Sequence, residues 1–124
     1  MRPVFLVEDN AAIRALLIPA LAEGADMEVM GFAESESEAV EWISRHRGDA
    51  DAVILDLFLK SGTGMGVLAR VAPMAHDYPI VVLTNSATDL LRRHCVALGA
   101  ESVFDKTAEL DAFLQHCRAL PRLQ

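Results

Sequence analysis

The fold is decided by the stretch DAVILDLFLKSGTG, residues 51–64. Its four consecutive apolar residues, Ala52–Leu55, are typical of a strand that is buried on both faces of a parallel sheet. The run stops at the carboxylate of Asp56, and two glycines follow within eight residues, so the chain turns sharply there. Open α/β sheets bind ligands at the carboxyl ends of their strands. Alone, an aspartate here is more often a simple turn residue, so its meaning depends on the rest of the chain.

Length and composition predict one globular domain over residues 1–124. Apolar residues make up 52% of the chain and charged residues 23%. No apolar run approaches the roughly 18 residues of a membrane span, and the apolar N-terminus is too short for a signal-peptide core. We therefore expect a cytoplasmic protein that does not bind membranes, with Cys95 and Cys117 as reduced thiols.

The charge of the chain argues against direct nucleic-acid binding. The formal net charge is −7, and basic residues cluster only at Arg92-Arg93 and in residues 45–47. Neutralising backbone phosphates requires a larger basic patch than either of these.

Apolar runs with strand and helix patterns alternate along the whole chain. Predicted strands are 3–7, 28–33, 51–55, 79–83 and 102–104; predicted helices are 11–23, 35–46, 64–72, 90–98 and 110–120. Pro19 should kink or shorten the first helix, and Gly24 should end it. Strand–helix alternation predicts an α/β fold: a five-stranded parallel sheet in the order 2-1-3-4-5, flavodoxin-like and doubly wound, with five helices.

In this strand order, five polar side chains converge at the carboxyl ends of the strands. They are Glu8, Asp9, Asp56, Thr84 and Lys106. Three adjacent carboxylates repel one another unless a cation neutralises them, and oxygen ligands without Cys or His favour Mg²⁺. A hydroxyl and an ammonium beside them would complete a phosphoryl-binding pocket. Each residue alone has an ordinary explanation, as a solvated loop, a strand end or a surface lysine; the joint placement carries the hypothesis.

Over essentially its full length, the chain resembles the receiver domains of two-component response regulators. The matching segments are residues 7–10, the apolar strand ending at Asp56, residues 56–64, 81–84, and 99–106. The set is specific, although no single segment is.

The resemblance implies a role for each of the convergent residues. Asp56 would accept a phosphoryl group from a phosphohistidine on a sensor histidine kinase or phosphotransfer protein. Mg²⁺ would be bound by Asp9, Asp56 and the backbone carbonyl of Phe58, with Glu8 acting through water. Lys106 would pair with the phosphoryl oxygens. Thr84 would hydrogen-bond one of them, which would draw its loop inward and alter the face formed by the fourth helix, fifth strand and fifth helix.

That face would then bind a downstream protein partner or a second copy of the chain. The resemblance favours a stand-alone receiver without an output domain, and a receiver cut from a longer protein remains an alternative. Neither would be an enzyme.

Four residues depart from the usual pattern of that family: Lys60, Asn85, Val103 and Thr107. Lys60 replaces a common proline, and Val103 replaces an aromatic residue that takes part in the switch. Phe104 cannot substitute for it, because adjacent strand residues face opposite sides of a sheet. Phe58, bulky and apolar two residues after Asp56, should hinder the attack of water on a phosphoryl group.

Two other functions stay open. A phosphorylation-independent adaptor could keep the fold alone, although the intact set of Asp9, Asp56, Thr84 and Lys106 argues against it. A Mg²⁺-dependent phosphatase with Asp56 as nucleophile would require a second acid two residues later, where this chain has Phe58.

Overall fold

The computed structural model describes residues 1–46, 48–73 and 79–121. Arg47, part of the short basic segment noted above, lies outside this range. The elements in chain order are β1 Arg2–Val7, α1 Ala11–Ala25, β2 Met27–Ala33, α2 Glu36–Arg45, β3 Ala52–Leu55, α3 Gly64–Val71, β4 Ile80–Thr84, α4 Asp89–Ala97, β5 Ser102–Asp105 and α5 Leu110–Ala119. Within the described residues, none of these helices has the length and apolarity that crossing a bilayer requires.

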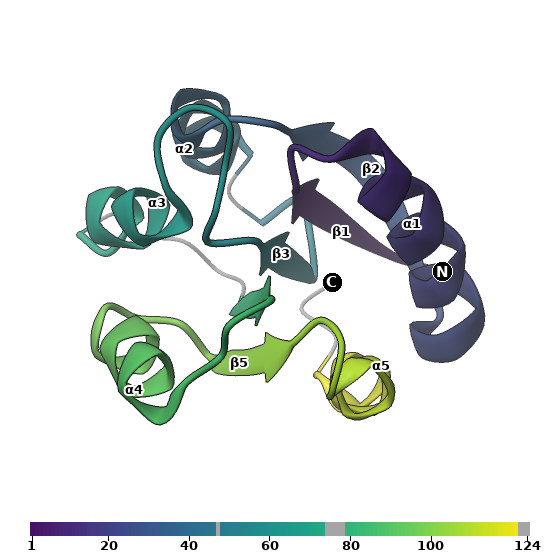
Figure 1. Ribbon diagram of the computed structural model, residues 1–124. Coiled ribbons are helices and arrows are strands. Elements are labelled where there is room, and N and C mark those ends of the chain that lie inside the picture. The colour runs from purple at the N-terminus through teal and green to yellow at the C-terminus, as the bar shows by residue number, and fades with distance from the viewer. Residues whose placement is uncertain (47, 74–78, 122–124) are drawn as a thin grey trace.

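The five strands form one parallel sheet in the order β2-β1-β3-β4-β5, which confirms the predicted fold class and topology. Figure 1 shows α1 and α5 on one side of this sheet and α2, α3 and α4 on the other. The register pairs Val7 of β1 with Leu55 of β3, and Thr84 of β4 with Asp105 of β5. The carboxyl ends of these four strands therefore lie along one edge of the sheet.

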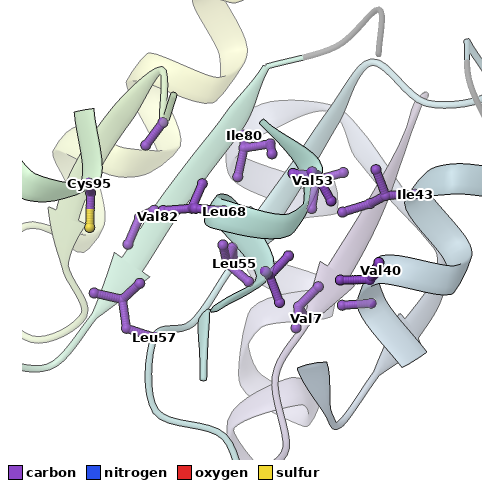
Figure 2. Close-up of a cluster of buried hydrophobic side chains, with 14 of the residues drawn as sticks. Val7, Val40, Ile43, Val53, Leu55, Leu57, Leu68, Ile80, Val82 and Cys95 are labelled. Atoms are coloured by element: carbon purple, nitrogen blue, oxygen red, sulfur yellow. The ribbon is translucent and has the colours of Figure 1, made fainter. Parts of the chain in front are cut away.

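Two hydrophobic layers, one on each face of the sheet, hold the strands in place. The layer under α2, α3 and α4 includes Val7, Leu55 and Val82, and Figure 2 shows these side chains packed together. The layer under α1 and α5 includes Leu21 and Phe113. Because every residue of β3 and β4 is buried, the central strands read as continuous apolar runs, as a parallel sheet covered on both faces requires.

The end of α1 differs from the prediction. The helix runs through Pro19 to Ala25 rather than being shortened. A proline removes one backbone hydrogen bond and crowds the preceding turn, and the burial of Leu17, Leu21 and Ala25 stabilises the helix on both sides of it. Gly24 does not end it. Asp26 caps the helix in the left-handed region, with φ 55°, and its N–H donates to the Leu21 carbonyl.

Candidate functional site

Strand pairing places the predicted site residues at neighbouring strand ends. Glu8 and Asp9 follow β1, and Asp56 follows β3, where its N–H donates to the Val7 carbonyl at 3.0 Å. Thr84 ends β4, and the N–H of Lys106, just after β5, donates to the Thr84 carbonyl at 2.9 Å. The backbone ladder alone therefore orders these five residues along one edge of the sheet.

Three carboxylates meet one ammonium at the centre of this edge. Glu8, Asp9 and Asp56 offer oxygen atoms that all lie within 4.8 Å of one another. Glu8 is 1% exposed and Asp56 is 6% exposed. Lys106 Nζ lies 2.5 Å from Glu8 Oε1 and 3.2 Å from Asp56 Oδ2. One ammonium cannot neutralise three carboxylates, so the cluster keeps an excess of negative charge, which a divalent cation with oxygen ligands would balance.

The protonation of Glu8 reflects this crowding. Burial raises the pKa of the Glu8 carboxyl above its ordinary value, the hydrogen bond from Lys106 opposes that shift, and the charge of Asp56 adds to it. The lysine therefore opposes, but does not cancel, the shift that burial and the charge of Asp56 cause. Added positive charge at the cluster would stabilise the charged form of Glu8.

Thr84 brings a hydroxyl without a partner to the same edge. Its side chain is fully buried, and among the described residues Oγ1 has no hydrogen-bond partner. Buried polar groups in proteins are nearly always hydrogen-bonded, and an unsatisfied one costs stability. This hydroxyl can therefore donate to a ligand oxygen without giving up a contact within the protein.

The loop after Asp56 approaches the carboxylate through its backbone. The N–H of Phe58 points to Asp56 Oδ1 at 3.4 Å, whereas the Phe58 side chain is 61% exposed. At the start of α3, a Cβ atom on Gly64 would lie 2.3 Å from the Asp56 carbonyl oxygen. Gly64 is therefore required for α3 to pack directly against the peptide of Asp56, a role beyond the turn that the sequence indicated.

Val103 and Phe104 lie on opposite faces of the sheet, as predicted. Val103 belongs to the layer under α2, α3 and α4. Phe104 packs against the other layer, where its ring meets the ring of Phe113 edge-on at 5.9 Å. The aromatic position of the usual switch is therefore filled by a buried aliphatic residue.

Sequence reasoning missed a polar cluster next to the carboxylates. Glu34, between β2 and α2, accepts hydrogen bonds from Arg14 and Lys60, each at 2.9 Å. Arg14 also donates to the Glu8 carbonyl at 2.8 Å. The hydrogen bond to Glu34, and more weakly the charges of Glu38 and Asp9, raise the pKa of Lys60. Contacts across 20 and 26 residues leave no local pattern, so only the spatial neighbourhood reveals this cluster.

Comparison with known proteins agrees with the fold and the family. The profile of the response regulator receiver domain family matches residues 4–118. The response regulator MprA of Mycobacterium sp. (strain KMS) is 31% identical over an alignment of 122 positions, which covers 96% of this chain and 50% of that protein. The chain spans about half the length of the first curated relatives it matches.

Solved structures of receiver domains have the same fold as this chain. The BeF3-activated receiver domain of Klebsiella pneumoniae RstA is 26% identical, with a TM-score of 0.81, and the match covers 95% of this chain and 97% of that one. The response regulator domain of Thermotoga maritima CheB has the same fold, with a TM-score of 0.83 at 20% identity and coverage of 97% and 96%. With the family profile matching almost the whole chain, this protein belongs to the response regulator receiver domains of two-component signalling.

Proposed function

We propose that Asp56 accepts a phosphoryl group from a phosphohistidine on a sensor histidine kinase or phosphotransfer protein in the cytoplasm. The observation that carries the proposal is the buried Asp56 carboxylate, 3.2 Å from the Lys106 ammonium and beside two further carboxylates. An Asp56 oxygen attacks phosphorus, so an O–P bond forms while the N–P bond to the imidazole breaks. Lys106 then pairs with the phosphoryl oxygens, a charge-assisted contact that favours the product.

The acidic cluster fits Mg²⁺, the ion that receiver domains generally bind at such a pocket. Glu8, Asp9, Asp56 and the Phe58 carbonyl are the residues that would hold it, with Glu8 acting through a water molecule. They are all oxygen donors, and the carboxylates carry uncompensated charge. When bound, Mg²⁺ supplies positive charge that stabilises the oxygens of the transferring phosphoryl group.

Thr84 is the residue that would respond to the phosphoryl group, by donating a hydrogen bond to one of its oxygens. Its buried hydroxyl, which lacks a partner within the described residues, gains a hydrogen bond when a phosphoryl oxygen arrives, and this gain favours an inward position of the loop after β4. Beyond that loop, α4 exposes Leu90 and Val96, which are 74% and 55% exposed. We place the contact with a downstream protein partner, or with a second copy of the chain, on this helix.

The test is the intact mass of the protein after incubation with acetyl phosphate and Mg²⁺. Wild type should gain one phosphoryl group, and Asp56→Asn should gain none while keeping its fold. Asp89→Asn, an exposed aspartate on α4, is the matched control and should be phosphorylated like wild type. A folded wild-type protein that gains no phosphoryl group, even from a panel of kinases, would instead favour the phosphorylation-independent adaptor.

Phe58 should set the lifetime of the phosphoryl group. Its side chain is largely exposed, beside the Asp56 carboxylate to which its own N–H points, and an apolar ring there gives an attacking water no hydrogen-bond partner. Phe58→Asn should lose the phosphoryl group several-fold faster than wild type, measured as decay of the adduct mass after removal of the donor. Equal decay rates would contradict this role.

A further inference from the structure

The Glu34 carboxylate lies between two cations that come from different parts of the chain. Its Oε2 accepts from Arg14 of α1, and its Oε1 accepts from Lys60 of the loop between β3 and α3. The Glu34 side chain is 29% exposed and that of Arg14 is 12% exposed. Arg14 is further fixed because its guanidinium lies 4.0 Å from the centroid of the Phe32 ring. The Arg14 half of the bridge is therefore a partly buried, well-supported contact, whereas the Lys60 half is a surface pair in which the Lys60 side chain is 59% exposed.

Each of the two cations contacts or belongs to a segment that carries part of the acidic cluster. Arg14 donates to the Glu8 carbonyl at 2.8 Å and so holds the peptide that precedes Asp9. Lys60 lies in the loop that begins after Asp56 and includes Phe58. The Glu34 carboxylate thus joins the end of β1 to the loop after β3.

Glu34 also engages the ammonium of Lys60 in an ion pair. Within the described part of the chain, Glu8 and Asp56 both pair with Lys106, whereas Asp9 forms no ion pair. Lys60 lies four residues after Asp56, in whose cluster Asp9 also lies, and the charge of Asp9 contributes weakly to the raised pKa of Lys60. If its ion pair with Glu34 were lost, the Lys60 ammonium could pair instead with the Asp9 carboxylate, which belongs to the acidic cluster.

We propose that Glu34 is a positioning residue for the divalent cation: it holds Lys60 away from Asp9 and joins the two segments that carry the cation's ligands. This inference rests on the proposed Mg²⁺ site. Partners that orient metal ligands without touching the metal typically change affinity by about 10- to 100-fold when they are removed. Glu34 acts on the ligands only through Arg14 and Lys60, so its loss, which both frees a competing cation and breaks the link between the two segments, should have an effect at the lower end of that range.

The test measures Mg²⁺ affinity by isothermal titration calorimetry on the unphosphorylated protein. Glu34→Gln should weaken binding about 10-fold. Glu38→Gln is the matched control, because it removes the same charge four residues away while a glutamine can keep the capping box that Glu38 forms with Ser35. Its affinity should stay within about twofold of wild type. Equal losses in the two variants would mean that only overall charge matters, and would overturn the proposal.

A double variant tests the competition directly. If Lys60 pairs with Asp9 once it is released, Glu34→Gln/Lys60→Met should regain part of the lost affinity, namely the part due to competition, while the part due to the lost link between the two segments remains. No recovery would overturn this part of the proposal. Glu34→Asp keeps the charge but has a shorter reach, so a loss of affinity there cannot come from charge alone. It also provides a second variant if Glu34→Gln does not fold.

Asp9→Asn separates this inference from the proposed function. If Asp9→Asn binds Mg²⁺ as wild type does, the proposed metal site is wrong. If Asp9→Asn loses binding while Glu34→Gln keeps wild-type affinity, the metal site stands and the role of Glu34 is wrong.

Discussion

A buried cation lies next to carboxylates at both ends of the parallel strands. We call the side where the strands begin the amino edge and the side where they end the carboxyl edge, and the two cations have different roles. At the amino edge, the Arg2 guanidinium donates to the Leu120 and Cys117 carbonyls at the end of α5, and its Nε lies 3.9 Å from Asp51 Oδ2. Arg2 and Asp51 are 4% and 1% exposed. One guanidinium faces one carboxylate there. At the carboxyl edge, Lys106 pairs with two carboxylates, Glu8 and Asp56, and a third, Asp9, lies beside them.

The difference distinguishes a structural ion pair from the site that we propose to be functional. Arg2 supplies donors to carbonyls that the last turn of a helix leaves without partners, and its charge is matched. Around Lys106 the charge is unmatched. Among the described residues, each edge has a buried polar atom without a hydrogen-bond partner, Asp51 Oδ1 at the amino edge and Thr84 Oγ1 at the carboxyl edge, so the charge balance is what distinguishes them. A protein keeps such an unbalanced arrangement where a ligand completes it.

Removing the amino-edge cation should have the largest effect. Arg2→Met leaves Asp51 charged and buried and takes two hydrogen bonds from the end of α5. Breaking one partner of a buried pair costs about 3–5 kcal/mol, so the free energy of unfolding should fall by that amount in urea titrations. Arg45→Met, which breaks an exposed pair with Glu41, is the control and should cost less than about 0.5 kcal/mol. A loss below about 1 kcal/mol in Arg2→Met would contradict the structural role of the pair.

The same Asp-to-Asn change should have opposite signs at the two edges. Without divalent cations, Asp56→Asn relieves repulsion within the acidic cluster and should raise the free energy of unfolding by about 1 kcal/mol. Asp51→Asn should lower it, because the buried Arg2 loses its counter-charge. Mg²⁺ should stabilise wild type more than Asp56→Asn, since a ligand stabilises only the state that binds it. Melting curves with and without Mg²⁺ test both expectations, and destabilisation of both variants would remove the contrast.

The smallest effect concerns Cys117, whose carbonyl accepts from Arg2. Burial raises the pKa of its thiol to about 12, so at pH 8 the reactive thiolate is about 10⁻⁴ of the total. An alkylating reagent should therefore leave Cys117 unmodified in the folded protein and modify it after denaturation, as peptide mass mapping would reveal. Arg2→Met should speed modification by loosening the end of α5. Rapid modification of the native protein would show that this edge opens easily.

Sequence reasoning predicted the fold because the decisive signals are local. Ala52–Leu55 and Ile80–Thr84 are uniformly buried strands, and their ends can be placed from the apolar runs alone. The residues that follow strand ends, such as Asp56 and Lys106, could therefore be grouped before any coordinates. The end of α1 could not be placed as well, because either Gly24 or Asp26 could take a left-handed conformation, and only Asp26 does.

The side-chain contacts that support the site could not be predicted from the sequence, and the reason is different. The pairing of Arg2 with the end of α5 spans more than 110 residues, and the Glu34 bridge joins three separate segments. Both depend on where long side chains point after the layers have packed. The sequence pattern does not indicate these side-chain directions, so from the sequence alone a lysine or an arginine in a loop is predicted to be an ordinary surface residue.

The close approach of Gly64 to the Asp56 peptide also bears on how this protein could be engineered. A side chain at Gly64 would collide with backbone, at 2.3 Å from the Asp56 carbonyl oxygen, whereas one at Gly66 would meet only the end of the Glu36 side chain. Backbone cannot yield there, but a glutamate can change rotamer. A library that diversifies the start of α3 should therefore keep Gly64 fixed and can vary Gly66. Two glycines in one helix thus differ greatly in how far they can be substituted.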